Sequence, residues 1–445
     1  MEDNIYTKEN ILEIIKRENI LFIRLQFIDI LGNPKNIVIP PSRLEEALDD
    51  GIPFDGSSVA GYATIEESDK VAKPDPCSFV ILPEEIEKRK TAKLNCDIYE
   101  PNGKRFIGDT KFVLEKMVNK AKKLGYIYNT GPECEFFLFK KDDDTYTLTP
   151  NDSAGYFDLS HRDLAEGVRA DISIALEALG IKTYTSHHEV SRGQHEINFH
   201  YDDALTTADR VITLKYVTKV IAKTHDLHAS FMPKPVYGLN GSGMHTHLSL
   251  FTMDGKNAFH DKKTNHLSTL ARQFIAGLLE HIKEITAVLN PTVNSYKRLV
   301  PGYEAPTYIS WAHRNRSALI RIPTGRGGNS TRCELRSPDL SGNPYLQFAV
   351  MLAAGLEGIE KRIEPPDPVE KNIYSLSVQE REKYNIHNLP ESLGHALAFM
   401  ENSEMLKETL GQHIFENFLY VKRKEWNEYR MQVTKWETDK YLPII

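Results

Sequence analysis

Acidic side chains alternate with an apolar one in a segment of the chain that is otherwise largely apolar. Glu133 and Glu135 stand on either side of Cys134, inside the run 131–139. Residues two apart in a strand point to the same face, so both carboxylates project together while Cys134 points into the core. The spacing alone is typical of an exposed charged edge, but the apolar flanks indicate a buried strand. Two like charges there are unfavourable unless a cation neutralises them.

Two further segments carry acidic or imidazole side chains at short spacing. Glu189 and Glu196 bracket a turn signal at 191–193, which favours a strand–turn–strand excursion over two helical turns. His245 and His247 are two apart and therefore share one face of a strand. Considered singly, the first pair indicates a solvated charged loop, and the second indicates polar histidines on a half-exposed sheet.

A fourth segment completes a set of hard oxygen and nitrogen donors. Glu334 and Arg336 share one strand face, a spacing that by itself indicates a surface salt bridge. Five carboxylates and one histidine at polar strand positions, taken together, favour Mg²⁺ or Mn²⁺ over Zn²⁺ or Cu²⁺. The candidate metal ligands are Glu133, Glu135, Glu189, Glu196, His245 and Glu334.

Arginines gather in the same part of the chain, and they indicate an anionic substrate. Arginine clamps phosphate and carboxylate oxygens through two parallel hydrogen bonds. A glycine-rich loop at 240–243 would bring backbone N–H groups to an anion. A nucleic-acid patch is the alternative, but the net charge of −7 argues against it. The residues alone therefore indicate a Mg²⁺-dependent enzyme that handles a nucleoside triphosphate and a carboxylate. The arginines are Arg314, Arg316, Arg321, Arg326, Arg332 and Arg336.

Length and composition indicate a globular protein of two to three domains. The chain has 445 residues, of which 40% are hydrophobic and 26% charged. We find no apolar run of the ~18–20 residues that a membrane span requires, and the charged N-terminus does not resemble a signal peptide. The four cysteines are scattered without a CxxC motif, so a disulfide scaffold is not expected. We expect a cytoplasmic enzyme.

The elements that would position these side chains change in character near residue 105. A hairpin at 19–40 and short strands at 78–82 and 91–99 predict a strand-rich domain over 1–105. In 106–445, four helical patterns are expected. The first begins at Asp109 or Thr110, and the second begins between 160 and 164, with Ser160 and Asp163 as start signals. The others begin at 267 and at 343. Strand patterns lie between them. The predicted fold class is α+β, with helices on one face of the sheet and the polar residues on the other. The strand patterns cover 133–138, 194–199, 245–250, 317–322 and 331–336.

Seven segments, in the same order along essentially the whole chain, resemble the type I glutamine synthetases of bacteria and archaea. The resemblance implies an N-terminal β-grasp domain, a catalytic domain with an antiparallel sheet, and the ATP-dependent ligation of ammonia to L-glutamate. The reaction would proceed through a γ-glutamyl phosphate and give L-glutamine, ADP and phosphate. The segments are FDGSS (54–58), GPECEFFLF (131–139), HHEVSRGQHE (187–196), NGSGMHTHLS (240–249), KRLVPGYEAP (297–306), RNRS (314–317) and RCELRSPD (332–339).

The resemblance also implies roles for individual residues. Two Mg²⁺ ions, or Mn²⁺, are held in this family by residues that match Glu135, Glu189 and Glu196 and by residues that match Glu133, His245 and Glu334. The glutamate site matches Asn240, Gly241, Arg298, Glu304 and Arg336. The ATP contacts match His247, Ser249, Arg316, Arg321 and Arg332. Asp55 and Glu304 match the ammonium site, with Asp55 favoured as the base, so the catalytic set is Asp55, Glu304, Arg321 and Arg336.

Assembly and regulation follow from the same resemblance. Related subunits form a dodecamer of two hexameric rings, in which a neighbour's β-grasp domain completes each active site and the stretch 421–445 serves ring-to-ring packing. A small nitrogen-signal protein is a further expected partner, and neither nucleic acid nor membrane is. The segment 142–156 is too short for the insertion of the adenylylated variant, although Tyr374 lies where that variant's modified tyrosine would. Thr64 replaces an arginine linked to glutamine feedback.

Two rival functions remain open. Another γ-glutamyl carboxylate–amine ligase of this family would share the ATP and metal residues but have a wider, less acidic amine pocket. A catalytically silent relative would have lost a metal carboxylate. All five carboxylates, FDGSS and PGYEAP are present, which favours ammonia as the second substrate.

Overall fold

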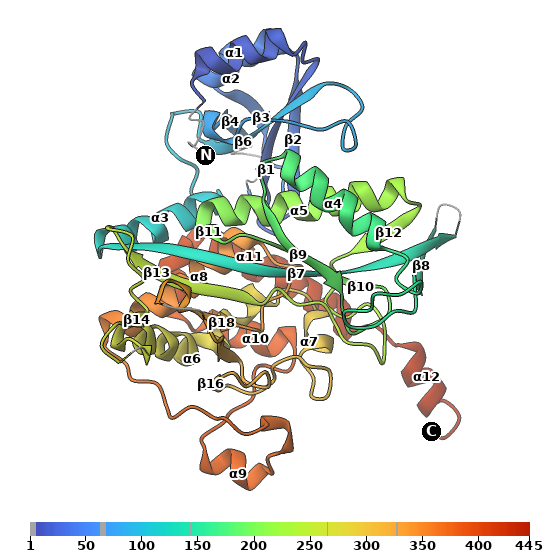
Figure 1. Cartoon of the computed structure of the whole chain (residues 1–445), viewed down its shortest axis with the longest axis vertical. Helices are drawn as coiled ribbons and strands as arrows, with labels where there is room; N and C mark the ends of the chain where they lie inside the picture. The colour runs from blue at the N-terminus through green and yellow to red at the C-terminus, as the bar shows by residue number, and fades with distance from the viewer. Residues whose placement is uncertain (1–5, 63–67, 143–144, 265, 326–327) are drawn as a thin grey trace.

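The computed structural model describes residues 6–62, 68–142, 145–264, 266–325 and 328–445, and it has two domains with separate hydrophobic cores (Figure 1). Thr64 and Arg326 lie outside the described residues. Among the described residues, every helix is too short or too polar to cross a lipid bilayer.

The smaller domain is a six-stranded sheet with two helices packed against it. Its strands follow the order β2-β1-β6-β4-β3, with β5 beside β6, and the central pair β1/β6 is parallel. The expected hairpin at 19–40 is confirmed as β1 and β2, and Gly32 in its turn adopts a φ of +82°. Its elements are α1 (Lys8–Arg17), β1 (Phe22–Ile28), β2 (Pro34–Ile39), α2 (Leu44–Asp49), β3 (Ile52–Asp55), β4 (Asp69–Pro74), β5 (Val80–Ile81) and β6 (Thr91–Tyr99).

The larger domain is built on a ten-stranded sheet with a long central strand, β7 (Tyr126–Asp142). The order is β16-β17-β18-β13-β7-β10-β9, and β8, β11 and β12 also pair with β7. All these pairs are antiparallel except β16/β17, which is parallel. The other strands are β8 (Thr145–Pro150), β9 (Thr183–His188), β10 (Gln194–Phe199), β11 (Asp202–Asp203), β12 (Leu227–Ser230), β13 (Thr246–Thr252), β16 (Trp311–His313), β17 (Ile320–Ile322) and β18 (Cys333–Leu335), with the small hairpin β14 (His260–Asp261) and β15 (His266–Leu267) apart.

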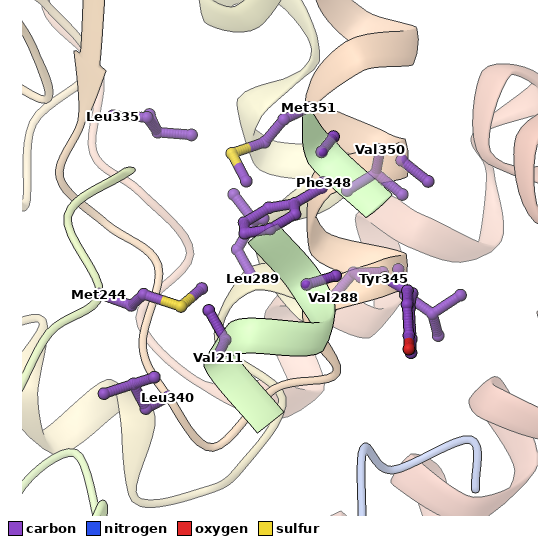
Figure 2. Packing of buried hydrophobic residues seen from close by; sticks show 14 of the residues in the cluster. Val211, Met244, Val288, Leu289, Leu335, Leu340, Tyr345, Phe348, Val350 and Met351 are labelled. Atoms are coloured by element: carbon purple, nitrogen blue, oxygen red, sulfur yellow. The ribbon is translucent and has the colours of Figure 1, made fainter. Parts of the chain in front are cut away.

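Helices cover one face of this sheet, as the α+β prediction requires. Helix α8 lies at the centre of this layer of helices, and almost all of its side chains are buried. Figure 2 shows Phe348 and Met351 of α8 beside Leu289 of α6, and Leu335 of the sheet belongs to the same hydrophobic cluster. The helices are α3 (Thr110–Lys123), α4 (Glu166–Ala178), α5 (Ala204–Thr224), α6 (Thr269–Leu289), α7 (Ser295–Arg298), α8 (Pro344–Glu360), α9 (Val378–Lys383), α10 (Leu393–Glu401), α11 (Glu404–Arg430) and α12 (Lys435–Tyr441).

One helix start differs from the prediction. The sequence placed the start signals of α4 at Ser160 and Asp163, but the helix begins at Glu166. The Asp163 carboxylate accepts a hydrogen bond from the Ala165 backbone N–H at 3.1 Å, directly before the helix, and both of its oxygens accept from the Arg169 guanidinium at 3.0 and 2.7 Å. The predicted start signal therefore lies at the N-terminal end of the helix, and the helix itself begins three residues after Asp163.

The small domain docks on the helices, on the side of the sheet away from its polar face. Asn343, which caps α8, donates from Nδ2 to the Asp29 carbonyl at 3.1 Å. Arg24 donates to the Tyr216 hydroxyl of α5 at 2.8 Å. Gly32 fits closely here, since a Cβ atom on it would lie 2.8 Å from Cα of Asn343. The small domain of one chain is therefore separated from the polar face by the helices and the sheet.

Candidate active site

The polar face of the sheet is set by strict alternation along two paired strands. In β10, Gln194, Glu196 and Asn198 point to this face, while Ile197 lies in the helical core and His195 is buried on the same side of the strand as Ile197. Glu196 stands directly opposite Glu135 of β7, and Asn198 stands opposite Glu133. The predicted same-face pair is thus confirmed, and it faces a third carboxylate across the ladder.

His245 joins Glu133 and Glu334 in one cluster. Their ligand atoms lie within 4.8 Å of one another, and Nδ1 of His245 is 3.1 Å from Glu133, 3.8 Å from Glu334 and 3.9 Å from Glu135. Glu334 is 1% exposed, and its oxygens accept hydrogen bonds from Arg321 at 2.5 Å and Arg336 at 3.2 Å. This donor set of two carboxylates and an imidazole fits a divalent cation.

A second cluster consists of His187, Glu189 and Glu196, again with ligand atoms within 4.8 Å. His187 pairs with Glu196 across β9 and β10, and its Nε2 lies 3.4 Å from the Glu196 carboxylate. The sequence reasoning did not single out His187, although its spacing of two from Glu189 is the same signal that was used for Glu133 and Glu135. Glu135, expected with Glu189 and Glu196, lies outside this group of three but lines the same cavity.

Burial and neighbouring groups shift the pKa values of these carboxylates in opposite directions. Burial, together with the charges of Glu135 and Glu196, raises the pKa of Glu189 to about 9. Burial also raises the pKa of Glu135. For Glu133, burial alone would raise the pKa, but hydrogen bonds with His245 and His247 bring it well below its usual value. A cation that binds here would relieve the repulsion that Glu189 and Glu135 experience.

Both clusters open into one cavity of about 480 Å³. All six predicted metal ligands line it, and so do Asn240, Gly241, Glu304 and three of the predicted arginines, Arg316, Arg321 and Arg336. Every described residue that lines it lies between 133 and 336, so it belongs to the larger domain alone. Cation-binding groups and arginines together in one cavity make it a site for an anion that binds together with metal ions.

Arg298 also lines this cavity, but its guanidinium contacts backbone. It is 2% exposed and donates to the carbonyls of Ser337 at 2.7 Å and Arg336 at 3.0 Å. A Cβ atom on Gly243 would lie 2.4 Å from its Nη2, so only glycine leaves room for this arginine. Arg298 fixes the backbone that carries Arg336.

A second cavity, of about 300 Å³, lies next to the first, further along β7, and Tyr184 lines both. It contains His247, Ser249 and Arg332, the three predicted nucleotide contacts that do not line the first cavity. Arg332 Nε donates to Nδ1 of His247 at 3.2 Å, and Nε2 of His247 donates to Glu133 at 3.0 Å, which links the two cavities. Its walls also include Tyr184, Phe199 and Tyr201, which the sequence did not indicate.

Glu304 sits at the rim of the first cavity on an exposed loop. Its φ is +56°, in the left-handed region, and Asn240 Nδ2 donates to its carboxylate at 3.4 Å. The next residue, Ala305, accepts a hydrogen bond from the Tyr374 hydroxyl at 2.6 Å. Gly302, with φ +93° and open space around it, gives this loop backbone freedom.

Asp55 is the one predicted catalytic residue that the fold of a single chain does not bring to the cavity. It ends the edge strand β3 and is exposed. The Ser57 backbone N–H donates to it at 2.8 Å, and hydrogen bonds from Ser57 lower its pKa below the usual value. It is therefore an ionised carboxylate on the surface of the small domain.

This fold and site define a class: a two-domain enzyme whose larger sheet carries opposed carboxylates, histidines and arginines. Residues 19–101 match the glutamine synthetase β-Grasp domain and residues 108–441 match the glutamine synthetase catalytic domain. The chain belongs to the glutamine synthetase family, and it is a glutamate–ammonia ligase that forms L-glutamine.

Individual relatives are similar over the full length. A glutamine synthetase from Clostridium saccharobutylicum is 52% identical over 439 residues, with 98% of this chain and 99% of that one covered. One from Thermus thermophilus is 52% identical over 444 residues, with the same coverage. Among solved structures, "GmaS/ADP complex-Conformation 1" has a TM-score of 0.88 at 34% identity, covering 97% of this chain and 99% of that one. "CryoEM Plasmodium falciparum glutamine synthetase" has a TM-score of 0.87 at 26% identity, covering 98% of each.

Proposed function

We propose that the first cavity carries out the ligation in two steps, through a γ-glutamyl phosphate. A free carboxylate is a poor electrophile because hydroxide leaves badly, so the γ-phosphoryl group of ATP is first transferred to the glutamate side chain. Ammonia then attacks the acyl carbon, and phosphate leaves. The observation that supports this proposal is the register that sets Glu135 opposite Glu196 and His247 opposite Glu334 in neighbouring strand pairs.

The two clusters fit hard divalent cations because five carboxylates converge there and no thiolate of the described residues lines the cavity. We propose Mg²⁺ as the resident ion, with Mn²⁺ as its substitute. When bound, the two ions would neutralise the charge of the transferring phosphoryl group. Arg321, half-buried beside Glu334, holds a positive charge at the same place. The ligands are Glu133, His245 and Glu334 for one ion, and Glu135, Glu189 and Glu196 with His187 for the other.

In this proposal glutamate occupies the first cavity and the adenosine part of ATP occupies the second. Arg336 would clamp the glutamate carboxylate, and Asn240 and Gly241 would line its other side. The faces of Tyr184, Phe199 and Tyr201 suit a planar base in the second cavity. Arg316, Arg321 and Arg332 would hold the phosphates between the two. The similar structure solved with ADP supports a nucleotide here.

The second substrate arrives as ammonium, which must lose a proton before it attacks. We propose that Glu304 and an Asp55 carboxylate attract this cation, and that Asp55 accepts the proton. Because Asp55 lies on the small domain, away from the cavity of its own chain, a neighbouring copy would supply it. The active site would then form only between subunits.

A dodecamer of two hexameric rings would provide such neighbours. The C-terminal residues support it, because α12 projects from the body of the chain (Figure 1) and Trp436 and Leu442 are 62% and 79% exposed. Trp426, by contrast, packs on its own chain at Gly394, so it contributes less to contacts between rings. We place the enzyme in the cytoplasm, in accord with its four free cysteines. A nitrogen-signal protein remains a proposed partner.

The proposed function is tested by measuring ADP release with glutamate, ATP and Mg²⁺, first with ammonium and then with methylamine or a polyamine in its place. We expect ammonium to support turnover and the bulkier amines to be poor substrates, since two carboxylates rather than an apolar pocket would receive the amine. Turnover on an amine at or above the rate with ammonium would contradict this choice of substrate. No ADP release with any amine would contradict the proposed mechanism.

Replacing Glu304 by alanine is expected to uncouple the two steps. The loop would lose its contact with Asn240 and one of the two charges for ammonium, so water would reach the acyl phosphate more often. We expect the ratio of ADP to glutamine, close to one in the wild type, to rise several-fold. The ratio is measured by quantifying both products in the same reaction; a ratio equal to that of the wild type would show that Glu304 does not retain the intermediate.

A further inference from the structure

Beneath the second metal cluster lies a buried group of polar side chains that the mechanism above does not use. Asp152, His188 and His195 bring their ligand atoms within 4.8 Å of one another. His188 and His195 are 1% and 0% exposed, and their rings pack edge to face at 4.8 Å between centroids. They directly precede Glu189 and Glu196 in the chain, so any movement of these histidines is transmitted to two candidate metal ligands.

This group is not itself suited to a cation. Arg169 places Nη1 3.0 Å from Nδ1 of His195, so a guanidinium occupies the direction of that nitrogen's lone pair. Asp163 holds Arg169 with two hydrogen bonds at 3.0 and 2.7 Å. A divalent cation would be repelled by Arg169. His188 has no free lone pair for a cation, because both of its ring nitrogens face hydrogen-bond acceptors.

Both ring nitrogens of His188 face acceptors. Its Nδ1 lies 2.6 Å from the Glu189 carbonyl, and its Nε2 lies 3.0 Å from Oδ1 of Asp152. The same oxygen of Asp152 also accepts from the Gly193 backbone N–H at 2.9 Å. One carboxylate oxygen therefore ties the start of the 189–193 turn, through His188, to its end at Gly193.

The turn is also fixed from its other side. Gly193 has a φ of +67°, and a Cβ atom there would lie 2.8 Å from Cβ of Pro150 and 2.9 Å from the Leu138 carbonyl. The Gly193 carbonyl accepts from the Leu138 N–H at 2.8 Å. The turn is thus held against β7 and the segment next to Asp152, with little room to shift.

We propose that Asp152 is a positioning residue for the metal site formed by Glu189 and Glu196, through the hydrogen bonds that it accepts from His188 and Gly193. The inference rests on the proposed function, in which those glutamates bind a divalent ion. Groups that orient metal ligands in this way commonly change metal affinity about 10–100-fold when they are removed.

The test is Mn²⁺ binding followed by electron paramagnetic resonance, with activity as a second measurement. For Asp152→Ala we expect one of the two Mn²⁺ sites to weaken about tenfold or more and the other to keep its affinity. Asp152→Asn keeps an oxygen that accepts the hydrogen bonds from His188 and Gly193, loses only the one that Oδ2 accepts from Nδ2 of Asn151 at 3.1 Å, and is expected to restore most of the affinity. Gly193→Ala adds a methyl group that displaces the same turn from its other side, and it should also weaken one Mn²⁺ site. It serves as the test if Asp152→Ala does not fold.

The matched control is Asp171→Asn, which changes a histidine–aspartate pair on the surface, where Asp171 lies 2.8 Å from Nε2 of His225. It is expected to leave both Mn²⁺ affinities unchanged. The positioning role is overturned if Asp152→Ala binds Mn²⁺ at both sites with wild-type affinity, or if both sites are weakened equally. If Asp152→Ala does not fold, the same two outcomes are judged on Gly193→Ala. Either outcome leaves the proposed function standing. A wild-type protein that binds no Mn²⁺ overturns both.

Discussion

The substitution Glu334→Gln is expected to reduce the rate at which the enzyme forms L-glutamine by about a thousandfold. The side chain is 1% exposed, lies in the His245 cluster, and accepts hydrogen bonds from Arg321 and Arg336. An amide of the same shape removes one negative charge from the proposed metal site. It also turns an N–H donor toward one of the two guanidinium groups, which offer only donors. Phosphoryl transfer would then lose both charge neutralisation and the placement of two arginines.

The measurement is steady-state glutamine formation, combined with Mn²⁺ binding and circular dichroism to show that the fold is intact. Glu284→Gln is the matched control, because Glu284 is a half-buried carboxylate that lies 3.1 Å from a ring nitrogen of His281, outside the cavity. We expect the control to keep wild-type activity. A folded Glu334→Gln protein with more than about a tenth of wild-type activity would remove Glu334 from the metal site.

The sequence predicted the parts of the site that depend on local periodicity. Alternation in a strand is independent of the rest of the fold, so the shared face of Glu133 and Glu135 followed from their spacing alone. Turn signals at 191–193 likewise predicted a strand–turn–strand segment, and Glu189 directly follows β9 while Glu196 lies on β10, whose predicted boundaries were confirmed. The two-domain α+β architecture was predicted from the same patterns and from the resemblance.

What the sequence did not predict depends on register and on long-range contacts. His187 reaches Glu196 only because β9 and β10 pair in one particular register. The aromatic wall of the second cavity combines Tyr184 of β9 with Tyr201 beyond β10. In each case the decisive partner lies on another element, so no local rule could identify it.

Replacing Asp55 by alanine is expected to lower glutamine formation by at least about a hundredfold while the binding of ATP persists. The carboxylate is ionised and exposed at the end of β3, and the residues that line both cavities belong to the larger domain. The loss would therefore concern ammonium capture and proton removal only, and the ammonium concentration for half-maximal rate should rise. Asp50→Ala is the control, an exposed carboxylate of the same domain, and should behave as wild type. Unchanged ammonium saturation would exclude Asp55 from the site.

Asp55→Ala also tests whether a neighbouring copy completes each site. Asp55→Ala and Glu334→Gln chains with different affinity tags can be co-expressed, and mixed oligomers can be isolated through both tags. If the cavity of one chain uses Asp55 of another, about a quarter of the sites in mixed oligomers combine two intact halves. Activity should then return to about a quarter of the wild-type value, although each variant alone is inactive. If Asp55 served the cavity of its own chain, every chain would carry a defective site and mixing would restore nothing. The mixed oligomer thus separates a site between subunits from a site within one chain.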